Sequence, residues 1–269
     1  NDFGFLPELS NPKDQKSNRF MVLTLTAPIV HSLVLIQPAF RVVDQAALAP
    51  YLIKCIEETK AEKGCLYYGW TLSEDKTELR CREAYVDGDA ASTHFDNALP
   101  IVGEFLENGY AEIMNIRLQG TAEHIADVKP KADPLGAAYY ETWDSFQNAV
   151  KADGPSDATV NFCTIEPTFT LHDKAVAEPF MAEMVEATRT ERGCVYYGWT
   201  ICGDKLFCRE AYVDGPAVVE HFGNALPLVG AMLESGAASL DKLEIHGPAS
   251  EVEKTKVAAD PLGAAYFTT

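Results

Sequence analysis

The sequence predicts an α+β protein made of two ferredoxin-like βαββαβ repeats, packed sheet to sheet as a pseudo-dimeric barrel within one chain. The main observation is an internal repeat. GCLYYGWT at 64–71 returns as GCVYYGWT at 193–200, and CREAYVDG at 81–88 returns at 208–215. Matched positions differ by 129 residues before the first hairpin turn and by 127 after it, so one two-residue deletion explains the register. A repeat of about 110 residues indicates a duplicated domain rather than a solenoid unit.

The repeat divides the chain into four segments. These are an N-terminal extension (1–31), a first repeat (32–143), a linker (144–158) and a second repeat (159–269). The extension has no counterpart in the second copy, and its apolar part at 20–30 is interpreted as an added strand or a cover. The linker ends in KADGPSDA, and its Gly, Pro and Asp residues are typical of an exposed connection.

Each element of the first repeat follows from a local pattern. A run rich in Val, Ile and Phe predicts a strand, Asp44 is a candidate N-cap, and the apolar residues after it recur at helical spacing. Asn108-Gly109 is a typical helix end, and Pro100 predicts a break in the helix before it. The expected order is a strand at 33–43, a helix after Asp44, a hairpin of 65–72 with 78–86, a helix at 90–106, a strand at 111–119, a short helix at 121–128 and a strand at 136–142.

A four-stranded sheet with its helices on one face leaves the other face bare. Two copies in one chain can bury these faces against each other, which is why we expect an internal dimer. A monomer is therefore sufficient, and a higher oligomer remains open.

Composition limits the classes of function. The chain has 269 residues, 47% hydrophobic and 23% charged, as in a globular protein of two ordinary domains. Its net charge of −18 argues against nucleic acid or an anionic membrane as partner. No apolar run approaches the roughly 18 residues of a membrane span. Seven cysteines without a CxxC motif favour buried thiols in a reducing compartment. We expect a soluble, intracellular protein, or one in an organelle after removal of a targeting segment.

Alternation along the hairpin sorts its side chains into two faces. With the turn centred near Asp75, one face carries Cys65, Tyr67, Glu83 and Tyr85. The other face carries Leu66, Tyr68, Trp70, Arg80 and Arg82. We expect Trp70 and Trp199, with Arg82 and Arg209, to lie at the joint between the halves.

Of six histidines, only His94 and His221 occupy matched positions, and Asn97 and Asn224 follow three residues later on the same helical face. If this face looks inward, each half has a pocket between helix and sheet. The pocket residues would be His94, Asn97, Glu83, Tyr85 and Tyr67 in the first copy, and His221, Asn224, Glu210, Tyr212 and Tyr196 in the second.

The motifs resemble a known family. A GC-L-Y strand that ends in Trp, an E-x-aromatic strand and a helix with H-x-x-N are similar to the antibiotic biosynthesis monooxygenases, a group of dimeric α/β barrels. The HGPA helix entry resembles their quinol monooxygenase branch. The resemblance implies a pocket in each half, and oxygenation of a small phenolic or quinol-type aromatic without metal or flavin. Two departures are E-x-Y in place of the E-x-W of many relatives, and the absence of a consistently matched Asn on the first strand.

The leading hypothesis is a cofactor-independent monooxygenase. His94 and His221 would accept a phenolic proton, Glu83 and Glu210 would support them, and the tyrosines and asparagines would orient the substrate. Each residue also has a structural explanation: the histidine fastens the helix, the carboxylate pairs with Arg82 or a neighbouring lysine at the sheet margin, the asparagine caps the helix break, and the rings form an ordinary core.

Two other classes remain open. One is a non-catalytic binding protein for an apolar or tetrapyrrole ligand, with His94 or His221 as an axial haem ligand. The other is a stress-related structural barrel. No metal site is expected, because one His and one Glu per pocket fall short of three ligands.

Overall fold

The computed structural model describes residues 33–148 and 162–269. The expected N-terminal extension and most of the expected linker lie outside the described residues. The first half contains β1 (Val34–Val42), α1 (Gln45–Thr59), β2 (Cys65–Ser73), β3 (Glu78–Tyr85), α2 (Gly88–Glu107), β4 (Ala111–Gly120), α3 (Ala122–Ala132) and β5 (Ala138–Gln147). The second half contains β6 (Cys163–Leu171), α4 (Lys174–Arg189), β7 (Cys194–Cys202), β8 (Lys205–Tyr212), α5 (Gly215–Glu234), β9 (Ala238–Gly247), α6 (Ala249–Ala259) and β10 (Ala265–Thr268).

Aspartates begin the long helices. Asp44 accepts a hydrogen bond from the backbone N–H of Ala47, as expected for an N-cap, and Asp87 does the same for α2. The expected break at Pro100 is wrong, because α2 continues through it. The proline costs one intrahelical hydrogen bond. Burial of the helix face that includes Phe95 and Phe105 compensates for this loss.

The ten strands of the described residues form one closed barrel in the order β1-β3-β2-β10-β9-β6-β8-β7-β5-β4, which confirms the expected pseudo-dimeric α/β barrel. The last strand of each half joins the two halves. β5 pairs in parallel with β4 and antiparallel with β7, and β10 pairs in the same way with β9 and β2. Closure leaves the sheet without a free edge.

This closure corrects one boundary. The last strand of the first repeat was expected at 136–142, with a linker from 144 onward, but β5 runs to Gln147. The extra residues pair with the other half, Asp144 opposite Trp199 and Gln147 opposite Tyr196. The partner strand β7 belongs to the other repeat. The sequence of one repeat alone therefore predicts that β5 ends earlier than it does.

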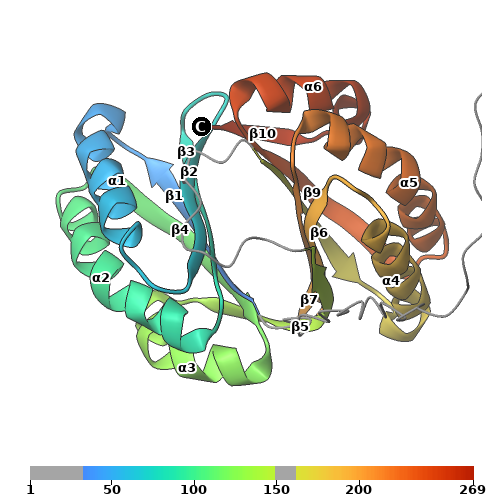
Figure 1. Ribbon diagram of the computed structural model, residues 1–269, viewed down its shortest axis with the longest axis horizontal. Coiled ribbons are helices and arrows are strands. Elements are labelled where there is room, and N and C mark those ends of the chain that lie inside the picture. The colour runs from blue at the N-terminus through green and yellow to red at the C-terminus, as the bar shows by residue number, and fades with distance from the viewer. Residues whose placement is uncertain (1–32, 149–161) are drawn as a thin grey trace, which may run out of the picture.

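The helices cover the outside of the barrel. Figure 1 shows α1, α2 and α3 on one side of the strands and α4, α5 and α6 on the opposite side. Each half has its own apolar core between its helices and its part of the sheet. Within the described part of the chain, no helix is both long and apolar enough to cross a membrane.

An irregularity early in β2 decides which side chains face the helices. Cys65 lies opposite Tyr85, as expected, but the register then shifts before Tyr67, so that Trp70 lies opposite Cys81. One extra residue in a strand reverses the alternation that follows it. Tyr68 and Trp70 therefore share the helix-facing side with Glu83, and β7 repeats the shift between Cys194 and Tyr196.

Candidate functional site

A buried histidine lies between two carboxylates in each half. His94 is on the inner face of α2, Glu83 is on β3, and Glu62 follows the end of α1. In the first half, the His94 Nδ1 atom is 2.9 Å from Glu62 Oε2, and its Nε2 atom is 3.0 Å from Glu83 Oε2. All three side chains are at most 5% exposed.

Two neighbours fix these carboxylates. Asn97 Nδ2 donates to Glu62 Oε1 over 3.0 Å, and the Tyr85 hydroxyl donates to Glu83 Oε2 over 2.5 Å. Asn97 therefore neither caps a helix break nor lines the pocket. Its role in the structure is to orient Glu62.

The second half repeats this arrangement. His221 Nδ1 lies 3.0 Å from Glu191 Oε2, and Nε2 lies 3.0 Å from Glu210 Oε2. Asn224 donates to Glu191 over 3.0 Å, and Tyr212 donates to Glu210 over 2.8 Å. Two copies of one polar arrangement thus lie in two separate cores.

The two carboxylates hold the histidine in its charged form. Burial by itself lowers the pKa of His94, but Glu83 and Glu62 outweigh burial and raise that pKa to about 9. The same groups of the second half raise the pKa of His221 to about 9. Each cluster at neutral pH therefore combines one imidazolium with two carboxylates and carries one net negative charge.

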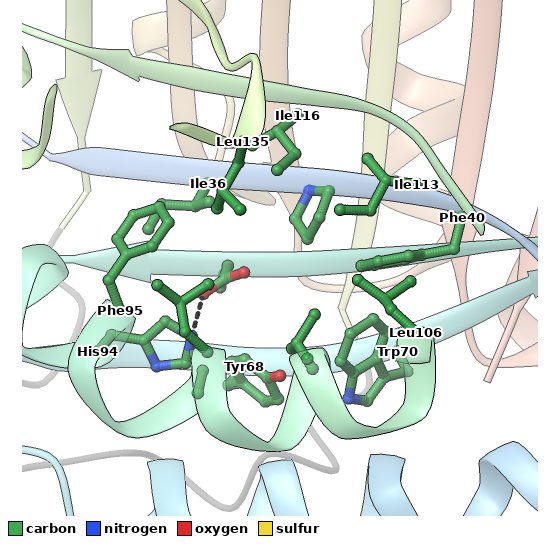
Figure 2. Close-up of a pocket in the computed structure, with 16 residues that line it drawn as sticks. Ile36, Phe40, Tyr68, Trp70, His94, Phe95, Leu106, Ile113, Ile116 and Leu135 are labelled. Atoms are coloured by element: carbon green, nitrogen blue, oxygen red, sulfur yellow. Dashed lines mark ion pairs between the residues drawn. The ribbon is translucent and has the colours of Figure 1, made fainter. Parts of the chain in front are cut away.

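An apolar cavity of about 260 Å³ opens beside His94 and Glu83, and a second one of about 290 Å³ opens beside His221 and Glu210. Figure 2 shows aromatic and aliphatic side chains around the first cavity, and a dashed line from His94 marks its ion pair with Glu83. The first cavity is lined by Ile36, Pro38, Phe40, Tyr68, Trp70, Glu83, His94, Phe95, Ala98, Leu99, Val102, Gly103, Leu106, Ile113, Ile116 and Leu135.

The two cavities are almost identical in sequence. Each has sixteen lining residues, and fourteen matched pairs are the same residue. The two differences are Ile113 against Leu240 and Ile116 against Leu243. Both cavities therefore offer one shape and one chemistry.

The structure brings some of the predicted residues together and separates others. His94, Glu83, Tyr85 and Asn97 form one hydrogen-bonded group, as do their partners His221, Glu210, Tyr212 and Asn224. The placement of Tyr67 and Tyr196 on this side is wrong, because the strand irregularity turns them into the barrel.

The predicted positions of the tryptophans are also wrong, in the opposite direction. Trp70 and Trp199 were expected at the joint between the halves, but each lines a cavity. Arg82 and Arg209 do lie inside the barrel, where the halves meet. Arg209 lies over the ring of Tyr67, 5.4 Å from its centroid. Both placements followed from simple alternation. The extra residue in β2 and in β7 precedes the tryptophans and reverses the side of the sheet that they face, whereas the arginines lie on β3 and β8 and keep their expected side.

Sequence reasoning missed Glu62 with Glu191 and Tyr68 with Tyr197. The glutamates carried a usable signal, since they occupy matched positions two residues before the glycine of the GC motif. Tyr68 and Tyr197 are matched as well, but nothing local to the strand marks the irregularity that turns them toward the helices.

The site fits haem poorly. An axial histidine needs a ring nitrogen with a free lone pair. Both ring nitrogens of His94 and of His221 are bonded to carboxylates. The lining residues therefore do not supply the axial ligand that the tetrapyrrole alternative requires.

Fold and site together define a dimeric α/β barrel with both half-barrels in one chain and a helix-covered pocket in each. A candidate monooxygenase from Fusobacterium nucleatum is 13% identical to the protein over 80% of this chain and 90% of that one, with a TM-score of 0.54. A candidate monooxygenase from Lactobacillus acidophilus has a TM-score of 0.49 at 13% identity, over 80% of this chain and 91% of that one. MupZ from Pseudomonas fluorescens is 28% identical over 40% of this chain and 90% of that one, with a TM-score of 0.37.

The first of these similarities confirms the fold, and the chain has the dimeric α/β-barrel fold that its motifs predicted. No protein-family model matches the sequence, and no curated protein matches it.

Proposed function

We propose that each half of the protein is a cofactor-independent monooxygenase site for a small, largely apolar phenol or quinol. The observation that carries the proposal is an apolar cavity that ends on a buried, net negative carboxylate–imidazolium–carboxylate cluster, present twice with fourteen of sixteen lining residues unchanged. A plain core needs no such cluster, because burying ionised groups costs free energy that packing alone does not return.

The cavity favours a flat aromatic ligand. Phe40, Tyr68, Trp70 and Phe95 surround the space, and aromatic rings pack well against such side chains. Among the described lining residues, His94 and Glu83 are the charged groups. A ligand hydroxyl would therefore be oriented toward this end of the cavity.

The cluster as a whole would take the proton. Neither nitrogen of His94 is free to act as a base, because both are bonded to carboxylates. Glu83 lines the cavity, so its carboxylate is the group of the cluster that would accept the proton from a ligand hydroxyl. When the phenol loses its proton, the negative charge moves from the cluster to the delocalised phenolate. The total buried charge is unchanged, which keeps the electrostatic cost of the step low.

The phenolate can then supply the electrons for oxygen. A new C–O bond forms at a ring carbon that bears hydrogen, and the resulting hydroperoxide loses water to leave a carbonyl group. For phenol itself the balance is C₆H₆O + O₂ → C₆H₄O₂ + H₂O, so one oxygen atom enters the product and the other leaves as water. The substrate supplies all four electrons, so the proposal requires no reductant.

Oxygen uptake with a panel of phenols, hydroquinones and hydroxynaphthalenes tests the proposal. We expect at least one compound to be consumed with one O₂ per molecule, and ¹⁸O₂ to label the product once. The Glu83→Gln/Glu210→Gln double variant should lose about 10²- to 10⁴-fold in rate, whereas Glu112→Gln, on the surface, should not. If no compound is consumed, or if the double variant matches the wild type, the catalytic assignment is wrong. Binding without consumption would favour the non-catalytic alternative.

A further inference from the structure

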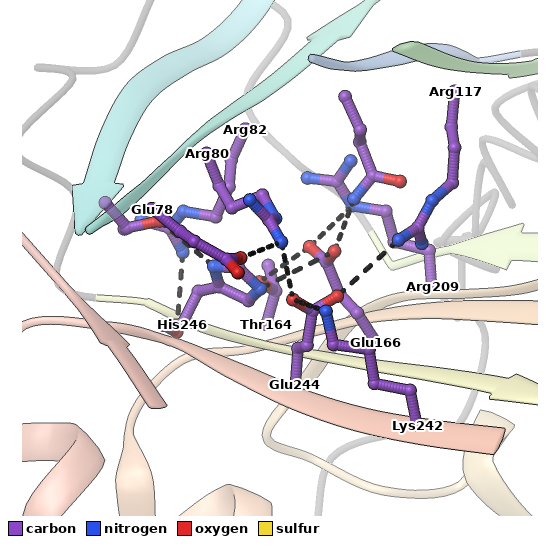
Figure 3. A network of polar contacts seen from close by, with 12 residues as sticks. Glu78, Arg80, Arg82, Arg117, Thr164, Glu166, Arg209, Lys242, Glu244 and His246 are labelled. Atoms are coloured by element: carbon purple, nitrogen blue, oxygen red, sulfur yellow. Dashed lines mark hydrogen bonds and ion pairs between the residues drawn. The ribbon is translucent and has the colours of Figure 1, made fainter. Parts of the chain in front are cut away.

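The inside of the barrel holds more buried cations than carboxylates. Figure 3 shows arginines gathered over Glu166 and Glu244. The cations come from β3, β4, β8 and β9, and they are Arg80, Arg82, Arg117, Arg209 and the half-exposed Lys242. This region lies between the halves and is separate from both helix-side cavities.

The charges are unevenly paired. Glu244 lies 2.7 Å from Lys242, 3.3 Å from Arg80 and 3.6 Å from Arg117, so this carboxylate already serves three cations. Glu166 Oε2 accepts a hydrogen bond of 2.6 Å from Gln37. The ion pair of Glu166 with Arg209 is 3.8 Å long, which is too far for a hydrogen bond.

Two arginines therefore lack adequate partners among the described residues. The side chain of Arg209 is 1% exposed, and its Nε, Nη1 and Nη2 atoms have no hydrogen-bond acceptor. Arg82 has an unpartnered Nε and a single long contact, 3.5 Å, from Nη1 to the carbonyl oxygen of His246. Burying a guanidinium with unsatisfied N–H groups is strongly unfavourable unless something else accepts their hydrogen bonds.

Arg82 and Arg209 also lie close enough to influence each other. Burial lowers the pKa of Arg82, and the charge of Arg209 lowers it further. Both guanidinium groups lie beneath partly buried aromatic rings, with Arg82 4.7 Å from the ring centre of Phe162 and Arg209 5.4 Å from that of Tyr67. The rings cover the arginines and provide no acceptor in the plane of the guanidinium groups.

We propose that Arg82 and Arg209 bind a small oxyanion, a carboxylate or a phosphate, inside the barrel. The planar fork of N–H groups on arginine matches the oxygens of these anions in a bidentate manner. The cluster as a whole has five cations, including Arg82 and Arg209, against the three carboxylates of Glu78, Glu166 and Glu244, and a bound oxyanion would reduce this positive excess. The two arginines occupy matched positions, one from each half, so the site requires both halves.

A metal ion is the competing occupant. The ligand atoms of Glu166, Glu244 and His246 lie within 4.8 Å of one another, and all three residues are buried. However, the nearby cations already neutralise both carboxylates. A divalent cation would add to an existing positive excess, whereas an oxyanion would remove it. The charge balance therefore favours the anion.

Binding is measured on the full-length protein, with inorganic phosphate in one series and acetate in the other, at constant ionic strength set with chloride. We expect a saturable rise in Tm and a matching heat of binding with a stoichiometry of one per chain, in at least one series. The series that responds identifies the anion as phosphate or carboxylate.

Three variants test the residues. Arg209→Gln and Arg82→Gln should each weaken binding at least tenfold, and Arg209→Lys should also weaken it, because it keeps the charge and loses the fork. Arg41→Gln, which removes a surface ion pair with Glu112, should bind as the wild type does. If Arg82→Gln or Arg209→Gln fails to fold, Arg209→Lys, which keeps the buried charge, carries the test of the residues.

Three results would overturn the proposal. One is the absence of a saturable effect of either anion on the wild type. Another is unchanged binding in Arg209→Gln. The third is a stoichiometric metal ion found in the purified protein, with a fall in Tm when a chelator removes it, which would assign the cluster of Glu166, Glu244 and His246 to a cation.

Discussion

The helix-side cavities and the barrel interior have diverged to very different extents between the two halves. The cavities differ at two of sixteen matched positions, and both differences exchange Ile for Leu. Matched positions inside the barrel differ in charge and polarity. The differing pairs include Gln37 with Glu166, Arg80 with Phe207, Arg117 with Glu244, and Gln119 with His246.

Symmetry explains this contrast. In a dimer of identical subunits, residues near the two-fold axis meet their own copies. Gln37 and Glu166 occupy matched positions and lie 2.6 Å apart as donor and acceptor. Two glutamates there would repel each other, and a dimer of identical subunits could not place an amide against a carboxylate, as this fused chain does. The cavities do not cross the axis, and fusion gives them no new pairing. Their similarity therefore reflects a shared requirement of the pocket.

If the clusters of His94 and His221 are equivalent, the largest expected effect of changing them is an equal loss of protein stability. His94→Leu leaves Glu62 and Glu83 buried without their cation and should lower the free energy of unfolding by about 3–5 kcal/mol. His221→Leu should cost the same to within about 1 kcal/mol, because its surroundings are the same. Urea unfolding at pH 7 measures both.

The exposed His172→Leu variant is the control and should change the stability by less than about 0.5 kcal/mol. A large difference between His94→Leu and His221→Leu would show that the two clusters are not equivalent, despite their matching distances.

The sequence predicted the features that both copies repeat, and it failed where the structure depends on a strand irregularity or on a contact between the halves. The repeat predicted the fold and the group of His94, Glu83 and Asn97, because matched residues in two copies stand out from unmatched ones. Alternation failed at Tyr68, since one extra residue in β2 reverses the faces and leaves no local signal. The extension of β5 to Gln147 depends on a strand of the other half, so a single repeat could not predict it.

Histidines of the two regions should respond to pH in opposite ways. Unfolded histidine titrates near 6.5, whereas His94 and His221 titrate near 9 when folded. Their stabilisation is complete below pH 6.5 and is lost as the pH rises to 9, by on the order of 3 kcal/mol for each histidine. In the interior, burial lowers the pKa of His246 well below 6.5. Its contribution is complete above pH 6.5 and is lost as the pH falls.

Unfolding measured from pH 6.5 to 7.5 tests the pocket histidines, because unfolded cysteine ionises at about 8.5 and the buried thiols therefore have little effect on stability in this range. The His94→Leu/His221→Leu double variant should lose this slope, and His246→Gln should keep it. His246→Gln should instead be less sensitive than the wild type to acid. A double variant that keeps the alkaline slope would contradict the charged state assigned to the pocket histidines.

The smallest expected change in stability comes from a glycine that lines each cavity at the matched position. Gly103 and Gly230 lie within α2 and α5, and a Cβ atom on either would meet nothing within 4 Å. Gly103→Ala and Gly230→Ala should each stabilise the protein by about 0.5–1 kcal/mol, since glycine is unfavourable inside a helix. A longer side chain should enter the cavity, so Gly103→Leu should reduce the ligand stoichiometry from two to one per chain without unfolding the protein. If Gly103→Leu still binds two ligands, the first cavity is not a binding site, and the equivalence of the two pockets does not extend to their function.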